Sequence, residues 1–135
     1  MSTPLDPPAA ATRPAESSYR EPGDLAVVRE FVRGEATALG LSPLRADLLA
    51  VAVSELATNT LQHTTGGGVV RIWADGERVR CDVVDEGRPP GFGRAMPAAD
   101  ELRGRGLAIV ERICDEVGIA SDGDGHTAVR LGMVR

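Results

Sequence analysis

The sequence contains no lysine: all 15 of its lysine-plus-arginine positions are arginines. This absence excludes three kinds of lysine-dependent chemistry. The phosphate-binding loop of P-loop proteins needs a lysine that reaches the phosphates, and eukaryotic-type protein kinases need a strand lysine for the same purpose. Schiff-base catalysis requires a lysine amine. If the chain handles a nucleotide, it must do so with other groups. The simplest explanation for the bias itself is codon usage in a GC-rich genome.

Cysteine, histidine and long apolar runs are also scarce. Cys81 and Cys114 form no CxxC pair, and His63 and His126 lie far apart, so no zinc-binding spacing is present. Two scattered cysteines fit reduced thiols in a cytoplasm. The sequence has no apolar run of about 18 residues and no signal-peptide core. These absences predict a soluble, cytoplasmic protein that does not associate with membranes.

Length and charge narrow the class further. A chain of 135 residues can form one domain with a modest core, and is too short for two. The net charge is −5, whereas a sequence-independent nucleic-acid binder is normally basic. Direct binding of DNA or RNA is therefore not expected.

The N-terminal segment differs in composition from the rest of the chain. Five of the nine prolines fall within residues 1–22, where Leu5 and Tyr19 are the only sizeable apolar side chains apart from Met1. Such a segment cannot bury enough surface to offset its ordering entropy. Residues 1–20 are predicted to be a disordered tail, whose last few residues could add an edge strand, and residues 21–135 to form the domain.

Periodicity and turn signals give the order of elements in the domain. Apolar residues recur at helical spacing in three segments, and short β-type runs fill four others. The predicted order is a helix at 24–39, a helix at 43–62, strands at 69–73 and 79–84, a loop at 86–103, a helix at 106–117, and strands at 117–121 and 127–134. This order predicts an α+β two-layer sandwich, with a mixed, mainly antiparallel sheet and helices on one face.

The predicted helix boundaries depend on particular residues. Asp24 is a plausible N-cap for the first helix and Gly40 a fitting stop. Ser42 and Pro43 provide an N-cap and a first helical position for the second. The apolar positions of this helix make one stripe, which consists of Leu44, Leu48, Val51, Ala52 and Leu56.

Glu55, Asn59 and His63 recur every four residues on the second predicted helix. This spacing places them along one side, within reach of a common ligand. A carboxylate and a carboxamide one turn apart suit Mg²⁺, which prefers oxygen ligands and keeps some waters. A glutamate there could also take a proton from a hydroxyl. The alternative is an ordinary solvated polar face, as helices commonly show such rows.

Three further features are glycine-containing segments at the ends of predicted elements. Asp85 and Gly87 follow a strand, where a carboxylate can accept from an exocyclic amine and a glycine lets a flat ring approach. Gly104-Arg105-Gly106 opens a helix, whose free N–H groups suit a phosphate, with Arg103 and Arg105 adding charge. Thr127 follows Gly125-His126 and could bind a base or a water. The respective alternatives are a turn, a flexible loop and a plain strand start.

Taken together, the order and spacing of these four blocks resemble the histidine-kinase-like (GHKL, Bergerat-fold) ATPases. The resemblance covers about residues 20–134. The segments at 54–63 and 104–110 are similar to those of the small bacterial anti-sigma-factor serine kinases, of the single-domain type found in actinobacteria. Two departures stand out: Arg88-Pro89 follows Gly87 where fuller members carry another glycine, and His126 stands where a small residue or lysine is frequent.

The resemblance implies a role for each matching residue. Glu55 would be the general base on the attacking hydroxyl, and Asn59 would hold Mg²⁺ between the phosphates of ATP. Asp85 and Thr127 would bind the adenine, and Gly87 would make room for its ring. The lid over the phosphates would contain the remaining residues, which are Gly104, Arg105 and Gly106.

The resemblance also implies a function and partners. The chain would bind ATP and Mg²⁺ and phosphorylate a serine or threonine of an anti-anti-sigma (STAS-like) protein, while also sequestering a sigma factor. A homodimer is a further expectation. The alternative is a non-catalytic module that uses ATP only as a ligand and regulates its partner by sequestration. The catalytic domain of a two-component histidine kinase fits less well, because no helical phosphoacceptor segment is evident.

Overall fold

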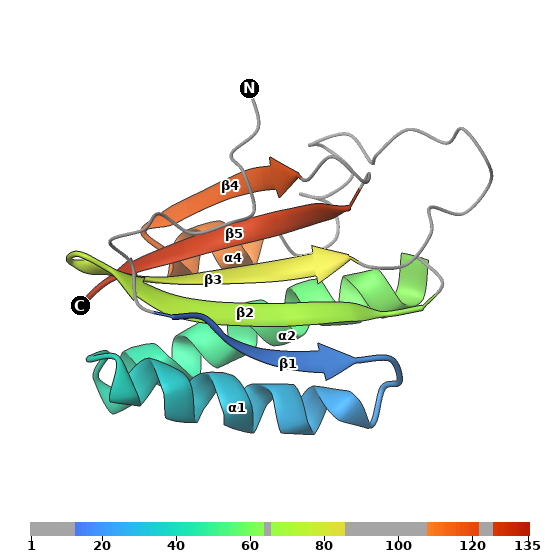
Figure 1. Ribbon diagram of the computed structural model, residues 1–135, viewed down its shortest axis with the longest axis horizontal. Coiled ribbons are helices and arrows are strands. Elements are labelled where there is room, and N and C mark those ends of the chain that lie inside the picture. The colour runs from blue at the N-terminus through green and yellow to red at the C-terminus, as the bar shows by residue number, and fades with distance from the viewer. Residues whose placement is uncertain (1–12, 64–65, 86–107, 122–125) are drawn as a thin grey trace.

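A computed structural model describes residues 13–63, 66–85, 108–121 and 126–135. These residues form two layers, a sheet with its helices on one face (Figure 1). The elements are β1 (Ala15–Tyr19), α1 (Asp24–Ala38), α2 (Pro43–His63), β2 (Gly68–Asp75), β3 (Arg78–Asp85), α4 (Ala108–Ile113), β4 (Glu116–Ser121) and β5 (Thr127–Val134). The predicted α+β sandwich is confirmed.

The sheet has five strands in the order β1-β2-β3-β5-β4. Each of its pairings is antiparallel. β2 and β3 form the predicted hairpin, in which Asp75 pairs with Arg78 and Gly76 adopts a positive φ of 62°. A two-residue turn with positive φ matches the twist of the flanking strands, which explains why Asp-Gly is so strong a hairpin signal.

The core lies between the sheet and the helices. Alternate residues of the central strands point toward the helices because side chains alternate across a strand. The buried strand residues on this face are Val70, Ile72, Val79, Cys81, Val83, Leu131 and Met133. They meet Val28, Val32 and Ala36 of α1 and the inner face of α2. This packing fixes both helices relative to the ends of the strands.

The start of α1 differs from the predicted boundary. The N-cap position is Gly23, and Asp24 is the first helical residue. The Asp24 carboxylate instead accepts the backbone N–H groups of Arg20 (2.8 Å) and Glu21 (3.1 Å). These hydrogen bonds lower the pKa of Asp24, because they favour its charged form. The prediction of an Asp24 N-cap is therefore wrong, although Asp24 organises the turn that leads into the helix.

The start of α2 follows the prediction. Pro43 is its first residue, and the Ser42 hydroxyl accepts the backbone N–H of Arg45 (3.3 Å). Proline tolerates this position because its missing N–H would have no helical partner. Gly40 has a φ of 111° just after the end of α1, so the glycine stop is confirmed too.

The apolar stripe of α2 is only partly buried. Leu44, Leu48 and Val51 expose 69%, 37% and 45% of their surface, whereas Ala52 and Leu56 are buried. The face that packs is a neighbouring one, made of Ala46, Leu49, Ala50, Val53, Leu56 and Ala57. α2 is apolar on more than one side, so periodicity alone cannot choose between faces.

β1 places part of the predicted tail inside the sheet. Residues 15–19 pair with β2 as an edge strand, and Tyr19 has no exposed surface. The sequence allowed for an edge strand at the end of the predicted tail, and residues 15–19 form it. Residues 1–12, the rest of the predicted tail, lie outside the described part of the chain.

The third predicted helix ends earlier than expected. α4 stops at Ile113, and β4 begins at Glu116. Between them, Asp115 donates its backbone N–H to Gly132 (2.9 Å), and its carboxylate accepts the backbone N–H of Val134 (2.7 Å). These bonds to β5 turn the chain into the sheet, which local periodicity cannot reveal. The bond from the Val134 N–H also lowers the pKa of the Asp115 carboxyl.

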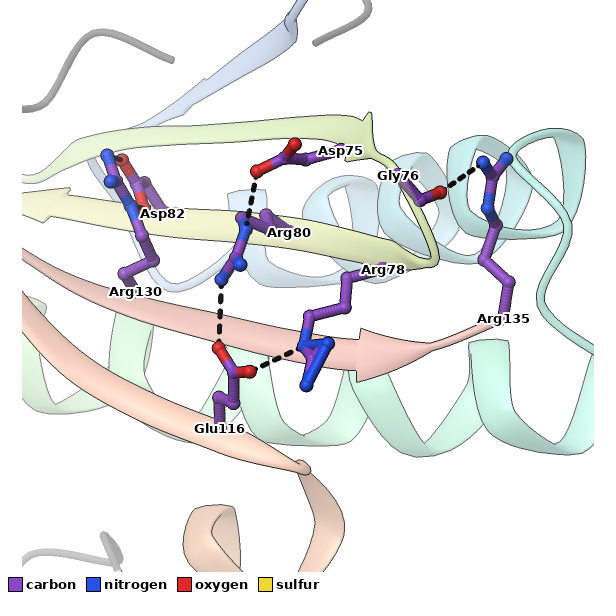
Figure 2. Close-up of polar contacts among 8 residues, drawn as sticks. All are labelled: Asp75, Gly76, Arg78, Arg80, Asp82, Glu116, Arg130 and Arg135. Atoms are coloured by element: carbon purple, nitrogen blue, oxygen red, sulfur yellow. Dashed lines mark hydrogen bonds and ion pairs between the residues drawn. The ribbon is translucent and has the colours of Figure 1, made fainter. Parts of the chain in front are cut away.

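The sheet face opposite the helices carries a network of ion pairs. Figure 2 shows Arg80 between two carboxylates: it bonds Asp75 (Nε–Oδ2, 3.0 Å) and Glu116 (Nη1–Oε2, 3.0 Å), and Glu116 also pairs with Arg78. No helix of the described residues covers this face. The paired charges therefore make their part of this face polar. The same face also carries a small buried apolar cluster, made of Val69, Val84, Ala120 and Ala128.

One ion pair in this network is buried. Asp82 has no exposed surface, and its two oxygens accept Nε and Nη2 of Arg130 at 2.7 and 2.8 Å. The Arg130 guanidinium lies 5.1 Å from the centre of the Trp73 ring, a distance that allows a cation–π interaction. Burial raises the pKa of Asp82, and the Arg130 hydrogen bonds oppose that rise.

No helix in the described ranges is long and apolar enough to cross a membrane. α2 is the longest of them at 21 residues, and it contains Arg45, Asp47 and Glu55.

Candidate functional site

α2 carries the first part of the predicted site. Glu55 and Asn59 lie one turn apart on this helix, and both are half-buried. Glu55 forms no hydrogen bond or ion pair with the described part of the chain, whereas Asn59 has a contact of its own. The helix extends to His63. A half-buried carboxylate without a partner keeps its oxygens available for a ligand or a proton.

The polar residues around Glu55 are held by the fold. Thr58 donates its hydroxyl to the backbone carbonyl of Ser54 (2.7 Å), and Arg29 of α1 donates to the Ser54 hydroxyl (3.0 Å). Back-bonding of this kind satisfies a hydroxyl within its own helix. Glu55 therefore differs from Ser54 and Thr58, because its carboxylate makes no such bond with the described residues.

Asp85 and Thr127 form the second part of the site. Asp85 ends β3, Thr127 begins β5, and the two are direct partners in the antiparallel register. Directly paired residues point to the same face of a sheet. Their alternation with Val83 and Leu131 places them on the face that the helices cover. Both side chains are half-buried. A carboxylate and a hydroxyl side by side can accept from and donate to one flat heterocycle.

The register extends this row across the sheet. Tyr19 pairs with Gly68, Gly68 with Asp85, and Asp85 with Thr127. A Cβ on Gly68 would meet the Val84 carbonyl oxygen at 2.0 Å and the Tyr19 hydroxyl at 2.7 Å. Only glycine fits at this position of the row. The sequence predicts only that the glycine run at 66–68 breaks the chain. In the structure its last residue, Gly68, begins β2 and pairs with Asp85.

The chain topology brings the two parts of the site to the same end of the domain. α2 ends at His63 and β2 begins at Gly68, so only four residues separate the helix end from the strand that pairs with Asp85. Figure 1 shows the end of α2, the start of β2 and the tip of β3 together at one end. The C-terminal end of α2 and the pair of Asp85 and Thr127 therefore lie at the same end of the domain, and the joint role of residues 55–59 with this pair stays a prediction from the sequence.

The remaining predicted site residues are the lid residues and Gly87. Gly87, Gly104, Arg105 and Gly106 lie outside the described residues. Their assignment as ring-accommodating and phosphate-binding residues stays a prediction from the sequence. His126, which precedes Thr127, is half-buried and has a contact of its own.

The donor set fits Mg²⁺ held jointly with a nucleotide. No group of three histidine, cysteine or acidic side chains within the described ranges could enclose a metal ion. Mg²⁺ commonly takes one or two protein oxygens, with phosphates and waters completing its octahedron. The Asn59 carboxamide is one such oxygen donor, and Glu55 lies one turn away on the same helix. The oxygen chemistry of these two side chains suits Mg²⁺.

Comparison with known proteins agrees with this geometry. A family model for the histidine kinase-like ATPase domain matches residues 19–133, which include both parts of the site. No curated protein matches the sequence significantly. The matched range begins at the last residue of β1 and ends within β5. The chain therefore belongs to the histidine kinase-like ATPase domain family and is an ATP-binding module of the GHKL type.

Proposed function

We propose that the chain is a protein serine/threonine kinase that phosphorylates an anti-anti-sigma (STAS-like) partner and also sequesters a sigma factor. The observation that carries the proposal is the Glu55 carboxylate, which is half-buried, lies one turn from Asn59, and makes no hydrogen bond or ion pair with the described residues. A module that only binds ATP has no need for such a base. A kinase that acts on a neutral hydroxyl does.

The residues on the strand ends would orient the nucleotide. Asp85 would accept a hydrogen bond from the exocyclic amine of adenine, and Thr127, its partner in the register, would bind the ring beside it. Gly87 would leave space for the ring plane. The Asn59 carboxamide oxygen would hold Mg²⁺, which when bound neutralises charge on the phosphates.

Phosphoryl transfer then depends mainly on position and charge. The acceptor oxygen bonds to the γ-phosphorus, the bond from that phosphorus to the β–γ bridging oxygen breaks, and ADP leaves. The hydroxyl proton passes to Glu55. Because the chain has no lysine, cationic help at the phosphates falls to arginine, with Arg105 between Gly104 and Gly106 the first candidate.

The proposed partners and location follow from the same resemblance. We infer a cytoplasmic protein that forms homodimers and contacts neither DNA nor RNA directly, in agreement with its net charge of −5. A pull-down from the native cytoplasm, with and without ATP and Mg²⁺, tests these partners. Recovery of neither a sigma factor nor an anti-anti-sigma protein would contradict the regulatory proposal.

Transfer of the labelled γ-phosphate of ATP to purified anti-anti-sigma proteins of the source genome tests the kinase activity. Replacing Glu55 by glutamine should slow transfer about 10²- to 10⁴-fold and leave the Kd for ATP nearly unchanged. Glu35→Gln is the matched control, because Glu35 is also a half-buried helical glutamate but lies on α1.

Each result has a distinct meaning. Transfer by the Glu55→Gln variant at the wild-type rate would rule out the base. Tight ATP binding by the wild type without transfer to any acceptor would replace the kinase with the non-catalytic sequestering module. An acid-labile phosphate on the acceptor would indicate histidine phosphorylation, whereas phosphoserine and phosphothreonine withstand acid.

A further inference from the structure

The outward face of α2 carries a line of apolar side chains that ends at Glu55. Leu44, Leu48, Val51 and Glu55 are spaced by four, three and four residues, which places them along one side of the helix. The three apolar residues expose 69%, 37% and 45% of their surface. We call Leu44, Leu48 and Val51 the outer stripe of α2.

The outer stripe does not contribute to the core. α2 packs against the sheet and α1 through its other face, which contains Ala46, Leu49, Ala50 and Val53. Scattered exposed leucines need no explanation, but apolar residues aligned on one face mark interaction sites. The stripe is therefore available for a contact outside the described part of the chain.

Charged residues on both sides of the outer stripe are already paired within the chain. Arg45 bonds Asp115 (Nη2–Oδ2, 2.8 Å) toward β4, and Asp47 bonds Arg33 (Nε–Oδ1, 2.5 Å) toward α1. Because these charges compensate each other, the surface offers a partner mainly apolar contact. A complementary partner should present apolar side chains and needs no opposing charges there.

The size of the stripe argues against a permanent interface. Three partly exposed side chains fall well short of the roughly 800 Å² per partner that a stable complex usually buries. A small apolar contact suits a partner that must dock, react and leave. A protein substrate of a kinase has this requirement.

We propose that the outer stripe docks the phosphoacceptor protein through an apolar surface next to its serine or threonine. This inference rests on the kinase function proposed above. A folded acceptor that approaches along the solvent-facing side of α2 meets the stripe next to Glu55. Docking then positions the hydroxyl, which gives its proton to Glu55 as its oxygen bonds to the γ-phosphorus and ADP leaves.

Steady-state transfer to a purified anti-anti-sigma acceptor tests the stripe. In the double variant Leu44→Gln/Leu48→Gln, the KM for the acceptor should rise about tenfold or more, because the acceptor no longer covers two leucine side chains when it docks. The kcat and the Kd for ATP should stay close to wild type, because a lost docking contact removes uniform binding. Both positions are exposed, so the midpoint of thermal unfolding should change by only about 3 °C.

A matched pair of valines provides the control. Val51 and Val134 are similarly exposed, at 45% and 39%, but Val134 ends β5 at the opposite end from Thr127. Val51→Thr should raise the KM for the acceptor about threefold, and Val134→Thr should leave it unchanged. In Leu44→Met/Leu48→Met, which keeps apolar contacts, the KM should return toward wild type.

The two proposals fail in different ways. If the wild type phosphorylates an acceptor but the double variant has the wild-type KM, the docking inference is wrong and the kinase function stands. A reduced kcat at constant KM would also contradict it, because that pattern indicates a catalytic or structural effect. If the wild type binds ATP and phosphorylates no acceptor, the proposed function is overturned and the docking inference falls with it.

Discussion

Replacing Arg130 with leucine should strongly destabilise the domain, because it leaves the Asp82 carboxylate buried without its partner. Asp82 has no exposed side-chain surface, and only 11% of the Arg130 side chain is exposed. Both carboxylate oxygens accept hydrogen bonds from the Arg130 guanidinium. The variant removes both bonds and the contact with the Trp73 ring.

The expected size follows from the burial of this pair. Removing one partner of a buried ion pair usually costs about 3–5 kcal/mol. We expect a loss of about 4 kcal/mol in the free energy of unfolding, a large share of the roughly 5–15 kcal/mol of a typical domain. The double variant Asp82→Leu/Arg130→Leu buries no unpaired charge and should be about as stable as the wild type or more so.

Urea denaturation at several pH values measures both effects. With a slope of about 2 kcal/mol per molar, the midpoint of Arg130→Leu should fall by roughly 2 M at pH 7. Arg130 opposes the rise in the Asp82 pKa caused by burial, so the variant should raise this pKa further. The folded variant then binds a proton that the unfolded chain releases, and its deficit should shrink as the pH falls from 7 toward about 4.

Two outcomes would refute this reasoning. A loss below about 1 kcal/mol would mean that the pair behaves as a surface ion pair. A deficit that does not change between pH 7 and pH 4 would mean that the lost stability comes from packing, and not from an ionised Asp82. Arg130→Lys separates charge from geometry, because lysine keeps the charge and loses the two parallel hydrogen bonds.

Three further predictions concern a glycine, a cysteine and the nucleotide site. Gly67→Ala should destabilise by about 2 kcal/mol or more, because its Cβ would meet the Tyr19 carbonyl oxygen at 2.0 Å; Gly76→Ala, with open space, is the control in thermal unfolding. Burial raises the pKa of Cys114 to about 12, so iodoacetamide at pH 8 should label this thiol only after unfolding. If mass spectrometry detects rapid labelling of Cys114 in the native protein, its burial is contradicted. Asp85→Ala should weaken ATP binding about tenfold in calorimetry, since the acceptor for the exocyclic amine is lost; an unchanged Kd would remove Asp85 from the site.

Local chemistry explains which elements could be predicted. The Asp75-Gly76 hairpin, the Ser42-Pro43 helix start and the strand at 127–134 depend on backbone conformations that a few adjacent residues impose. The end of α4, in contrast, depends on contacts with a distant strand. Asp115 turns the chain by bonding to Gly132 and to the Val134 backbone N–H in β5, and no local signal reports that contact.

The candidate site divides in the same way. Glu55 and Asn59 share a side of α2 because of helical spacing, which the sequence contains. The direct pairing of Asp85 with Thr127 depends on the register of two strands separated by 41 residues between those positions. That register follows from pairing along the whole length of β3 and β5, which no local signal in the sequence reports.

The fold class, the order of elements and the candidate residues could be predicted because they follow from periodicity, turn chemistry and motif spacing. Which face of α2 is buried depends on tertiary packing. Both faces are apolar, and the alanine-containing one packs because small side chains let the helix approach the sheet and α1 closely. The consequence is that Leu44, Leu48 and Val51 remain exposed on the same side of α2 as Glu55.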